Sequence, residues 1–463
     1  MSAVLDPSTG RQIAAVPRGG AADVDRAVAA ARERFAEWRR LSPTERGRAC
    51  TEAARGLRAA APELAELGAR DVGFPLPAVE RDVEAAARYF EYYGGLADKV
   101  DGEVVPLGDG FLDYTRRQPW GVCAVVVPYN SPFQLLARSA APALAAGNCV
   151  VAKAAEQAPL GPLALAATLE AAGIPAGALN VVTGGAEAGS RLVGHEDVDR
   201  VTFTGSEATG RAVHAAAGRN LTPVTLELGG KSPQIVFADA DLELAAATIV
   251  GSLVWSAGQV CSAGTRVLVE RRVRGEVVEA IVERMRATRI GPALEAPDMG
   301  PLIDEPLRGR VRDAIDRARA GGARLLTGGA EPPAGTDPGG FYVAPTVFET
   351  DDPRSDLVQE EIFGPVLAVL EFDDAAGAVA LANATRFGLM GSVWTRDVGR
   401  AHRVAAELEC GQVYVNTYGA GLGTELPFGG FKRSGIGREK GIAGYLEYTQ
   451  TKNVCIKVDP DDE

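Results

Sequence analysis

From residue 119 onward, short apolar runs alternate with alanine-rich stretches and with turns rich in glycine and proline. The apolar runs have the length of buried strands, and most of the stretches between them have helical spacing. Such alternation predicts parallel strands joined by right-handed crossovers, an α/β doubly wound sheet that can hold a nucleotide at the carboxyl ends of its strands. The expected strands are Val122 to Pro128, Cys149 to Lys153, Leu179 to Thr183, Val201 to Thr204 and Val224 to Leu228.

A second alternating series, from Gln234 to Phe431, predicts a separate α/β domain. Residues 327 to 340, rich in glycine and proline, are expected to form a surface loop. Residues 21 to 100 are expected to form a covering layer of helices that begin near Asp23 and Ser42, because cap-type residues or proline stand there. The expected strands of the second domain are Gln234 to Phe237, Thr265 to Val269, Val366 to Phe372, Gly391 to Thr395 and Gly411 to Asn416.

The composition disfavours several classes of function. The 463 residues include 48 basic and 61 acidic side chains, and the net charge of -13 argues against a broad nucleic-acid or anionic-membrane surface. No apolar run approaches a membrane span, and no secretory leader opens the chain. Six scattered cysteines and three histidines form no cluster, so neither a disulfide framework nor a metal site is expected. We expect a cytoplasmic protein whose partners are small molecules and other subunits.

Three residues have the chemistry of covalent acyl transfer. Cys261, in the segment GQVCSAGTR, is a nucleophile that can add directly to an aldehyde carbonyl. Asn130, in VVPYNSPF, carries an amide that can donate to the resulting oxyanion, with the backbone N–H of Cys261 as a second donor. Glu227, in LELGGKSP, ends an expected buried strand, where a raised pKa would suit it to deprotonate water. A buried core thiol, a turn asparagine and a capping carboxylate are the alternative interpretations.

Together these motifs resemble the NAD(P)-dependent aldehyde dehydrogenase superfamily, from Asp6 to about Lys457. The resemblance implies a Rossmann-like NAD-binding domain (residues 1–100 and 120–229), a second α/β catalytic domain (230–432) and a small β element for oligomerisation (101–119 and 446–463). It implies oxidation of an aldehyde through a thiohemiacetal and a thioester that water hydrolyses. Retention of Glu227 argues against the branch that transfers the acyl group to coenzyme A. Further motifs that carry the resemblance are FTGS at 203–206, EIFGP at 361–365 and PFGGFKRSG at 427–435.

The sequence departs from the family pattern at three places. Tyr129 stands where a tryptophan is usual, and Ala154 where a proline is common. Because the chain begins close to its DPSTG segment, we expect it to lack most of the N-terminal strand pair that many members carry.

The resemblance also implies a cofactor site. Lys153 and Glu156 are expected to hold the adenine ribose, and the carboxylate of Glu156 would repel a 2'-phosphate, which favours NAD while leaving NADP possible. Gly205 and Ser206 end a strand and begin a helix, where free N–H groups attract a pyrophosphate. The remaining two residues, Glu361 for the nicotinamide ribose and Phe363 beside the ring, would make the cofactor bridge both domains.

Four residues are expected to line the substrate tunnel: Gln134, Arg138, Trp255 and Phe428. Gln134 and Arg138 share one face of the helix expected after Asn130 and make the wall unusually polar. This motivates the hypothesis that the aldehyde carries a carboxylate or another polar group. The alternative is that Arg138 pairs with a neighbouring acid.

Two other functions stay open from the sequence. A cysteine acyl hydrolase would use the same thioester chemistry without a cofactor, although the few histidines leave no obvious Cys-His pair. A non-catalytic member of the fold would produce no NADH. Segments 101–119 and 446–463 resemble the strands that build intersubunit sheets in the family, which implies a homodimer or homotetramer. Edge strands left exposed would otherwise invite uncontrolled pairing.

Overall fold

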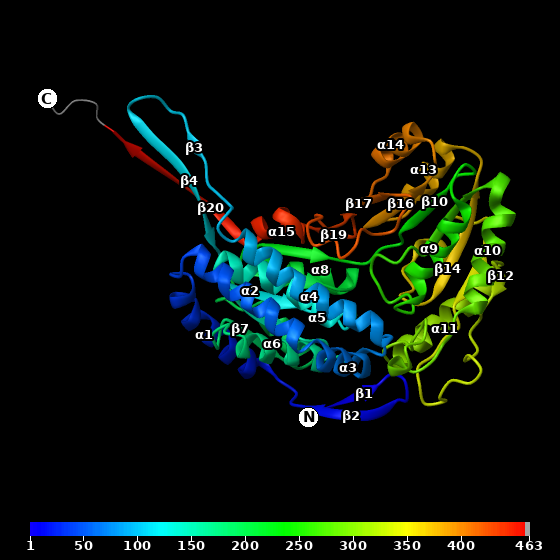
Figure 1. Cartoon of the computed structure of the whole chain (residues 1–463), viewed down its shortest axis with the longest axis horizontal. Coiled ribbons are helices and arrows are strands. Elements are labelled where there is room, and N and C mark those ends of the chain that lie inside the picture. The colour runs from blue at the N-terminus through cyan, green and yellow to red at the C-terminus, as the bar shows by residue number, and fades with distance from the viewer. Residues whose placement is uncertain (459–463) are drawn as a thin grey trace.

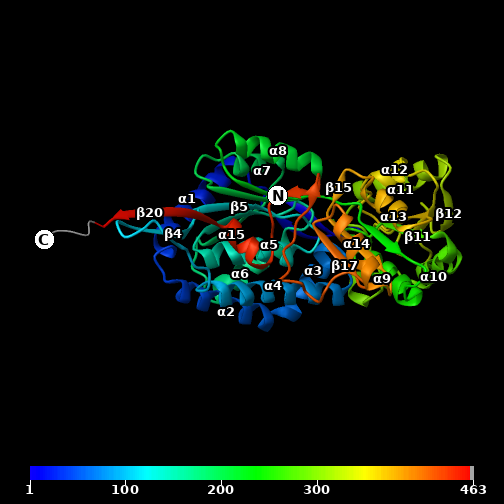
Figure 2. The ribbon, with the colours of Figure 1, turned by 90° about the horizontal axis from the view of Figure 1, so that it is seen from above.

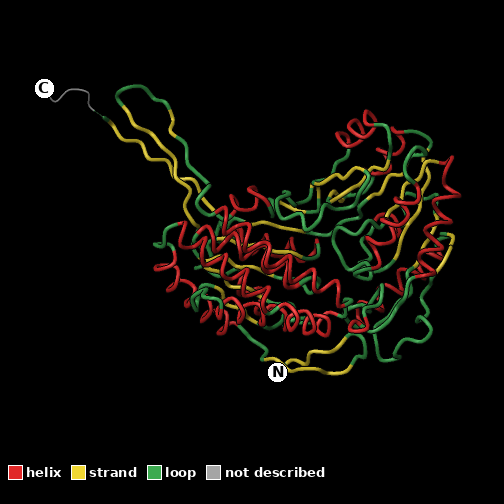
Figure 3. Tube along the Cα trace, viewed as in Figure 1, coloured by secondary structure: helices red, strands yellow, loops and turns green. Residues whose placement is uncertain are grey.

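The computed structural model describes residues 1–458 and contains two large sheets, each covered by helices, and a projecting antiparallel arm (Figure 1). The α/β architecture predicted from the sequence is confirmed. Figure 3 shows the helices as layers on both sides of the strands. The domain boundaries drawn from the sequence stay a prediction.

The first sheet has the strand order β19-β9-β8-β5-β6-β7, parallel except for β19. Connections diverge between β5 and β8, which is the switch point where doubly wound sheets bind ligands. Runs of small and β-branched residues suit these strands, because both faces are buried. Their bounds are β5 Val122–Val126, β6 Cys149–Lys153, β7 Leu179–Val182, β8 Arg200–Thr204, β9 Val224–Glu227 and β19 Gly435–Ile436.

Helices cover both faces of this sheet (Figure 2). α5 and α6 pack on one face and carry α2, α3 and α4 as an outer layer, while α1, α7 and α8 lie on the other. A capping box begins α2, where Ser42 and Glu45 bond each other's backbone N–H groups. The bounds are α1 Ala21–Trp38, α2 Pro43–Ala59, α3 Ala61–Val72, α4 Leu76–Leu96, α5 Pro132–Ala146, α6 Leu160–Ala171, α7 Ala186–Val193 and α8 Glu207–Gly218.

The second sheet has the order β12-β13-β14-β11-β10-β16-β17 and is parallel except for β12. The sequence missed β12 and β13, two edge-side strands that flank the correctly expected loop after residue 327. The bounds are β10 Pro233–Val236, β11 Arg266–Glu270, β12 Arg324–Thr327, β13 Thr346–Glu349, β14 Val366–Phe372, β16 Met390–Trp394 and β17 Gln412–Val415.

Helices α9 and α10 pack against each other on one side of the second sheet, and α13 and α14 also pack against its strands. Two short strands, β15 and β18, pair outside both sheets. The bounds are α9 Leu242–Val254, α10 Arg274–Ala287, α11 Glu305–Ala320, α12 Asp356–Gln359, α13 Ala375–Asn383, α14 Val398–Glu407, α15 Gly441–Glu447, β15 Phe387–Gly388 and β18 Phe431–Lys432; two 3-10 turns span Arg271–Val273 and Ala293–Glu295.

The arm consists of β3 (Val104–Val105), β4 (Phe111–Pro119) and β20 (Thr449–Lys457), and it extends away from the body of the molecule (Figure 1). Strands therefore form within both expected segments, 101–119 and the described part of 446–463. Residues 459–463 of that expectation lie outside the described chain.

The expectation that most of an N-terminal strand pair is missing is wrong. Strands β1 (Ser2–Asp6) and β2 (Arg11–Val16) form an antiparallel hairpin. The DPSTG segment is its turn, in which Ser8 N–H donates to the Asp6 carboxylate at 2.7 Å and Gly10 adopts a φ of 68°. The few residues before this turn are enough to form a strand.

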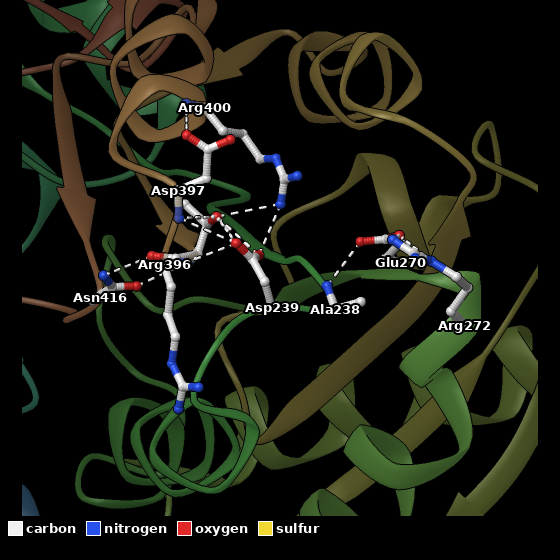
Figure 4. A network of polar contacts seen from close by, with 9 residues as sticks. Ala238, Asp239, Glu270, Arg272, Arg396, Asp397, Arg400 and Asn416 are labelled. Atoms are coloured by element: carbon white, nitrogen blue, oxygen red, sulfur yellow. Dashed lines mark hydrogen bonds and ion pairs between the residues drawn. The ribbon is translucent and has the colours of Figure 1, made fainter.

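Polar side chains at the carboxyl ends of the second sheet satisfy one another (Figure 4). Asp239, beyond β10, accepts hydrogen bonds from the Asp397 N–H at 3.1 Å and from Arg400 Nη1 at 2.8 Å. Glu270, at the end of β11, accepts from the Ala238 N–H at 2.8 Å. These carboxylates hold the loops at this edge of the sheet. Few polar groups at the edge therefore remain free to bind a ligand.

Ser434 connects the loop that follows β9 of the first sheet with β15, the short strand just before β16 of the second. Its buried hydroxyl donates to the carbonyl of Gly229 at 2.7 Å and accepts from the N–H of Gly388 at 3.0 Å, while its carbonyl accepts from the N–H of Leu228 at 2.9 Å. The PFGGFKRSG segment thus fixes the loop that follows β9.

Ser434→Ala is expected to lower the free energy of unfolding by about 1–3 kcal/mol, because two buried backbone groups lose their partner. Denaturant unfolding measures the change, and Ser190→Ala, which removes an exposed hydroxyl on α7, is the control. Equal stability of the two variants would show that Ser434 does not fix this loop.

Candidate active site

A cavity of about 570 Å³ is lined by residues of α4, α5, α9, β16 and β17 and of the loops that carry Cys261 and Phe428. The structure brings together in it six residues singled out from the sequence: Asn130, Gln134, Arg138, Trp255, Cys261 and Phe428.

Cys261 lies in the loop between α9 and β11 and contacts the apolar cluster around Met390 and Phe428. Burial raises the pKa of its thiol to about 12, and the nearby Arg138 guanidinium opposes the rise. The thiol is therefore protonated at neutral pH in this state, and it must lose a proton before it can attack a carbonyl.

Asn130 follows β5 and precedes α5. Its side chain is buried, faces the cavity and makes no hydrogen bond to any part of residues 1–458. The chain turns sharply here, because Ser131 adopts a left-handed φ of 56° before Pro132 begins the helix. An amide held in this way is available to an oxyanion.

Glu227 ends β9 and is almost completely buried. Neither carboxylate oxygen has a hydrogen-bond partner within the described chain. Burial raises its pKa well above the ordinary value, against the opposing charge of Arg138. A carboxylate with a raised pKa and no partner is equipped to take a proton from water.

The turn after Glu227 brings the two sheets into contact. A Cβ on Gly230 would lie 2.7 Å from the carbonyl oxygen of Cys261, and a Cβ on Gly229 would lie 2.0 Å from a carboxylate oxygen of Glu361. The Gly230 N–H donates to that carboxylate at 3.1 Å. Only glycines allow this approach, so the two glycines bring the loop of Glu227 against Cys261 and Glu361.

Polar residues also end the neighbouring strands of the first sheet. Lys153 closes β6 and is buried, and its side-chain ammonium has no hydrogen bond or ion pair among the described residues. Burial lowers the pKa of Lys153, and Glu156 opposes this. The exposed Glu156 carboxylate lies against Gly185, where a Cβ would approach it to 2.9 Å.

Gly205 and Ser206 form the turn from β8 into α8. The Gly205 N–H donates to the Glu227 carbonyl at 3.0 Å, and the Ser206 hydroxyl caps α8 by accepting from the Thr209 N–H at 3.3 Å. A pocket of about 520 Å³ begins here and also includes Glu361. Burial raises the pKa of Glu361 to about 7.

Phe363 adopts a left-handed φ of 59° and contacts Tyr129 edge-to-face, with ring centroids 6.1 Å apart. Tyr129 is the residue that departs from the family's tryptophan, so this position still supplies an aromatic neighbour to Phe363. All the predicted cofactor residues therefore lie at the carboxyl edge of the first sheet or face it from the second.

Arg138 is not a free anion-binding group. Its guanidinium forms an ion pair with Glu439, and the two side chains are only 3% and 1% exposed. Arg138 also donates to the Thr204 hydroxyl at 2.8 Å, and the Ser139 hydroxyl donates to Glu439 at 2.6 Å. The alternative interpretation, pairing with a neighbouring acid, is the one the structure supports.

Two residues of this region escaped sequence reasoning, Glu439 and Lys440. Lys440 lines the cavity, and Glu439 lies behind it. The signal that could have found them is the charged run Arg438-Glu439-Lys440 between two glycines, directly after the PFGGFKRSG motif.

Arg138→Leu is expected to destabilise the fold by roughly 3–5 kcal/mol, because it leaves the buried Glu439 carboxylate without its counter-ion. The double variant Arg138→Leu/Glu439→Leu should recover much of this loss. Thermal and denaturant unfolding of both measure it. A single variant as stable as the parent would refute the pairing.

The chain matches the model of the aldehyde dehydrogenase family over residues 1–454. It is 45% identical over 453 residues to a betaine aldehyde dehydrogenase of Sinorhizobium fredii, covering 97% of this chain and 92% of that protein. A betaine aldehyde dehydrogenase 1 of Rhizobium meliloti is 44% identical, with 98% and 93% covered. The solved structure of betaine aldehyde dehydrogenase from Staphylococcus aureus in complex with NAD+ superposes with a TM-score of 0.96 at 34% identity and covers 99% of this chain and 92% of its own. The chain therefore belongs to the aldehyde dehydrogenase family.

Proposed function

We propose that this chain uses Cys261, Asn130 and Glu227 to oxidise an aldehyde to a carboxylic acid with NAD as the hydride acceptor. The observation that carries the proposal is the cavity that contains Cys261 and Asn130, beside a buried Glu227 whose carboxylate has no partner.

The Cys261 thiol first loses its proton to solvent water in the cavity, and the thiolate then adds to the aldehyde carbon. The carbonyl oxygen becomes an oxyanion that the Asn130 amide and the Cys261 N–H can stabilise. NAD held by Lys153, Glu156, Ser206 and Glu361 would supply the acceptor for the hydride of that carbon, whose loss leaves the acyl group on the Cys261 sulfur as a thioester. Glu227 takes a proton from water as the water attacks that thioester, which releases the acid and regenerates the thiolate.

The residues present fit NAD. Lys153 ends β6 beside the switch point and Glu156 follows in the next loop, where doubly wound sheets hold the adenosine part of a dinucleotide. The free N–H groups at the start of α8, behind Ser206, suit the pyrophosphate. Glu361 borders the same pocket from the second sheet and is placed for the nicotinamide ribose.

We further infer assembly into a homodimer or homotetramer in the cytoplasm. The arm of β3, β4 and β20 carries exposed apolar side chains, including Val104, Phe111 and Ile456, that another subunit could cover. All six cysteines are free, as suits a reducing compartment. No helix within residues 1–458 is both long and apolar enough to cross a membrane.

Glu227→Gln is expected to release a burst of about one NADH per active site and then to turn over roughly 10²- to 10⁴-fold more slowly than the parent, because the thioester loses its general base. The parent's steady-state rate should rise with pH as the raised pKa of Glu227 is passed and the carboxyl loses its proton, and the variant should lack this rise. Stopped-flow absorbance at several pH values measures both.

Cys261→Ala should form no NADH, while Cys455→Ala, which changes an exposed cysteine on the arm, should behave as the parent does. Ester cleavage by the parent that needs Cys261, with no NADH formed from any aldehyde, would instead identify a cysteine hydrolase.

Glu156→Gln is expected to improve kcat/KM for NADP relative to NAD by at least about tenfold, since the repulsion of the 2'-phosphate is removed. Steady-state kinetics with both cofactors give this ratio, and Glu170→Gln, an exposed change on α6, is the control. An unchanged ratio would mean that Glu156 does not face the adenine ribose.

A further inference from the structure

The substrate cavity has an excess of positive charge. Among the residues that line it, the cations are Arg81, Arg138 and Lys440, and the only carboxylate is Asp82. Glu439 neutralises Arg138 from behind the wall.

Asp82 does not compensate the others. Its carboxylate is directed to the start of α5 and accepts from the Phe133 N–H at 3.2 Å. Burial raises its pKa to about 7, although the N–H groups of Phe133 and Gln134 lower it. At neutral pH a part of this group is uncharged, and the rest is bound to a helix N-terminus.

Arg81 and Lys440 are the lining cations that have no ion pair within residues 1–458; Arg81 is exposed, whereas Lys440 is only partly exposed. Neither an ion pair nor a hydrogen bond engages its ammonium within residues 1–458; its Nζ lies 5.1 Å from the ring centroid of Phe428 and 6.0 Å from that of Tyr89. Burial lowers its pKa to about 8, so most of the charge persists at neutral pH. Lys440 and Cys261 line the same cavity, so the ammonium lies near the reacting centre. The Arg138 charge adds to the lowering of the Lys440 pKa, and the carboxylates of Glu439 and Glu227 oppose it.

The aromatic wall at Phe428 already holds cations of this chain. The Arg138 guanidinium lies 5.4 Å from the ring centroid, in addition to Lys440. A quaternary ammonium group, which aromatic cavities otherwise bind, would compete for this ring and would meet the Lys440 charge. This matters because betaine aldehyde, named for the relatives, carries a trimethylammonium group.

We propose that Lys440 is the specificity residue of the cavity, binding the carboxylate of a short aldehyde acid whose aldehyde carbon reaches Cys261, and that cationic aldehydes are rejected. The assignment rests on the proposed aldehyde oxidation. Lys440, which has no buried counter-ion, then binds the anion in place of Arg138.

The test compares kcat/KM for succinate semialdehyde, butanal and betaine aldehyde. The parent should prefer succinate semialdehyde to butanal by at least about tenfold, as a charge-assisted hydrogen bond implies, and should use betaine aldehyde least. In Lys440→Met the ratio of the semialdehyde to butanal should fall by about 10- to 100-fold. Arg48→Met, an exposed loss of one charge on α2, should keep the parent's ratio.

If Lys440→Met does not fold, inhibition of the parent enzyme still tests the role of Lys440. Succinate should inhibit butanal oxidation more strongly than choline does. Stronger inhibition by choline, a parent that prefers betaine aldehyde, or an unchanged ratio in a folded Lys440→Met would overturn the assignment of Lys440. Failure to oxidise any of the three aldehydes would instead overturn the proposed function itself.

Discussion

The contact on which the rest of the site depends is the approach of the Gly229-Gly230 turn to the second sheet. This turn lies between β9 of one sheet and β10 of the other, so it is where the chain passes from the first α/β unit to the second. With no Cβ at Gly230, the backbone reaches the Cys261 carbonyl, and Gly229 leaves room for Glu361. Ser434 holds the turn from behind. The proposed nucleophile, the proposed base and the carboxylate proposed to face the cofactor are thus positioned by one short segment.

The two sheets share an architecture but use their carboxyl edges differently. In the second sheet, Asp239 and Glu270 are bound by neighbouring backbone and arginine groups and stabilise loops. In the first sheet, Asn130, Lys153 and Glu227 are buried with no side-chain hydrogen bond to the rest of residues 1–458. Leaving buried polar groups unpaired costs stability, and such groups collect where a ligand completes them. The unpaired polar groups, more than the fold, thus indicate that the carboxyl edge of the first sheet is the functional one.

Local pattern predicted much of this structure, and long-range pairing explains what it missed. The bounds of β6 and β14 follow from continuous apolar runs, and the start of α2 follows from Ser42 and Pro43. Strands β12 and β13 border a glycine-rich loop, and they form by pairing with each other and with β14. The partner of Arg138 could not be read locally, because Glu439 lies on a distant segment. The sequence alone therefore suggested Arg138 as a free cation of the cavity, and only the folded structure shows that Glu439 pairs with it.

Acyl transfer on Cys261 can be observed by trapping the acyl group on the enzyme. Glu227→Gln is mixed with NAD and an aldehyde, quenched in acid within the first turnover and digested for peptide mass spectrometry. The peptide containing Cys261 should gain the mass of the acyl group in amounts that match the NADH formed. An unmodified Cys261 peptide beside stoichiometric NADH, or an acyl group on another cysteine such as Cys410, would contradict it.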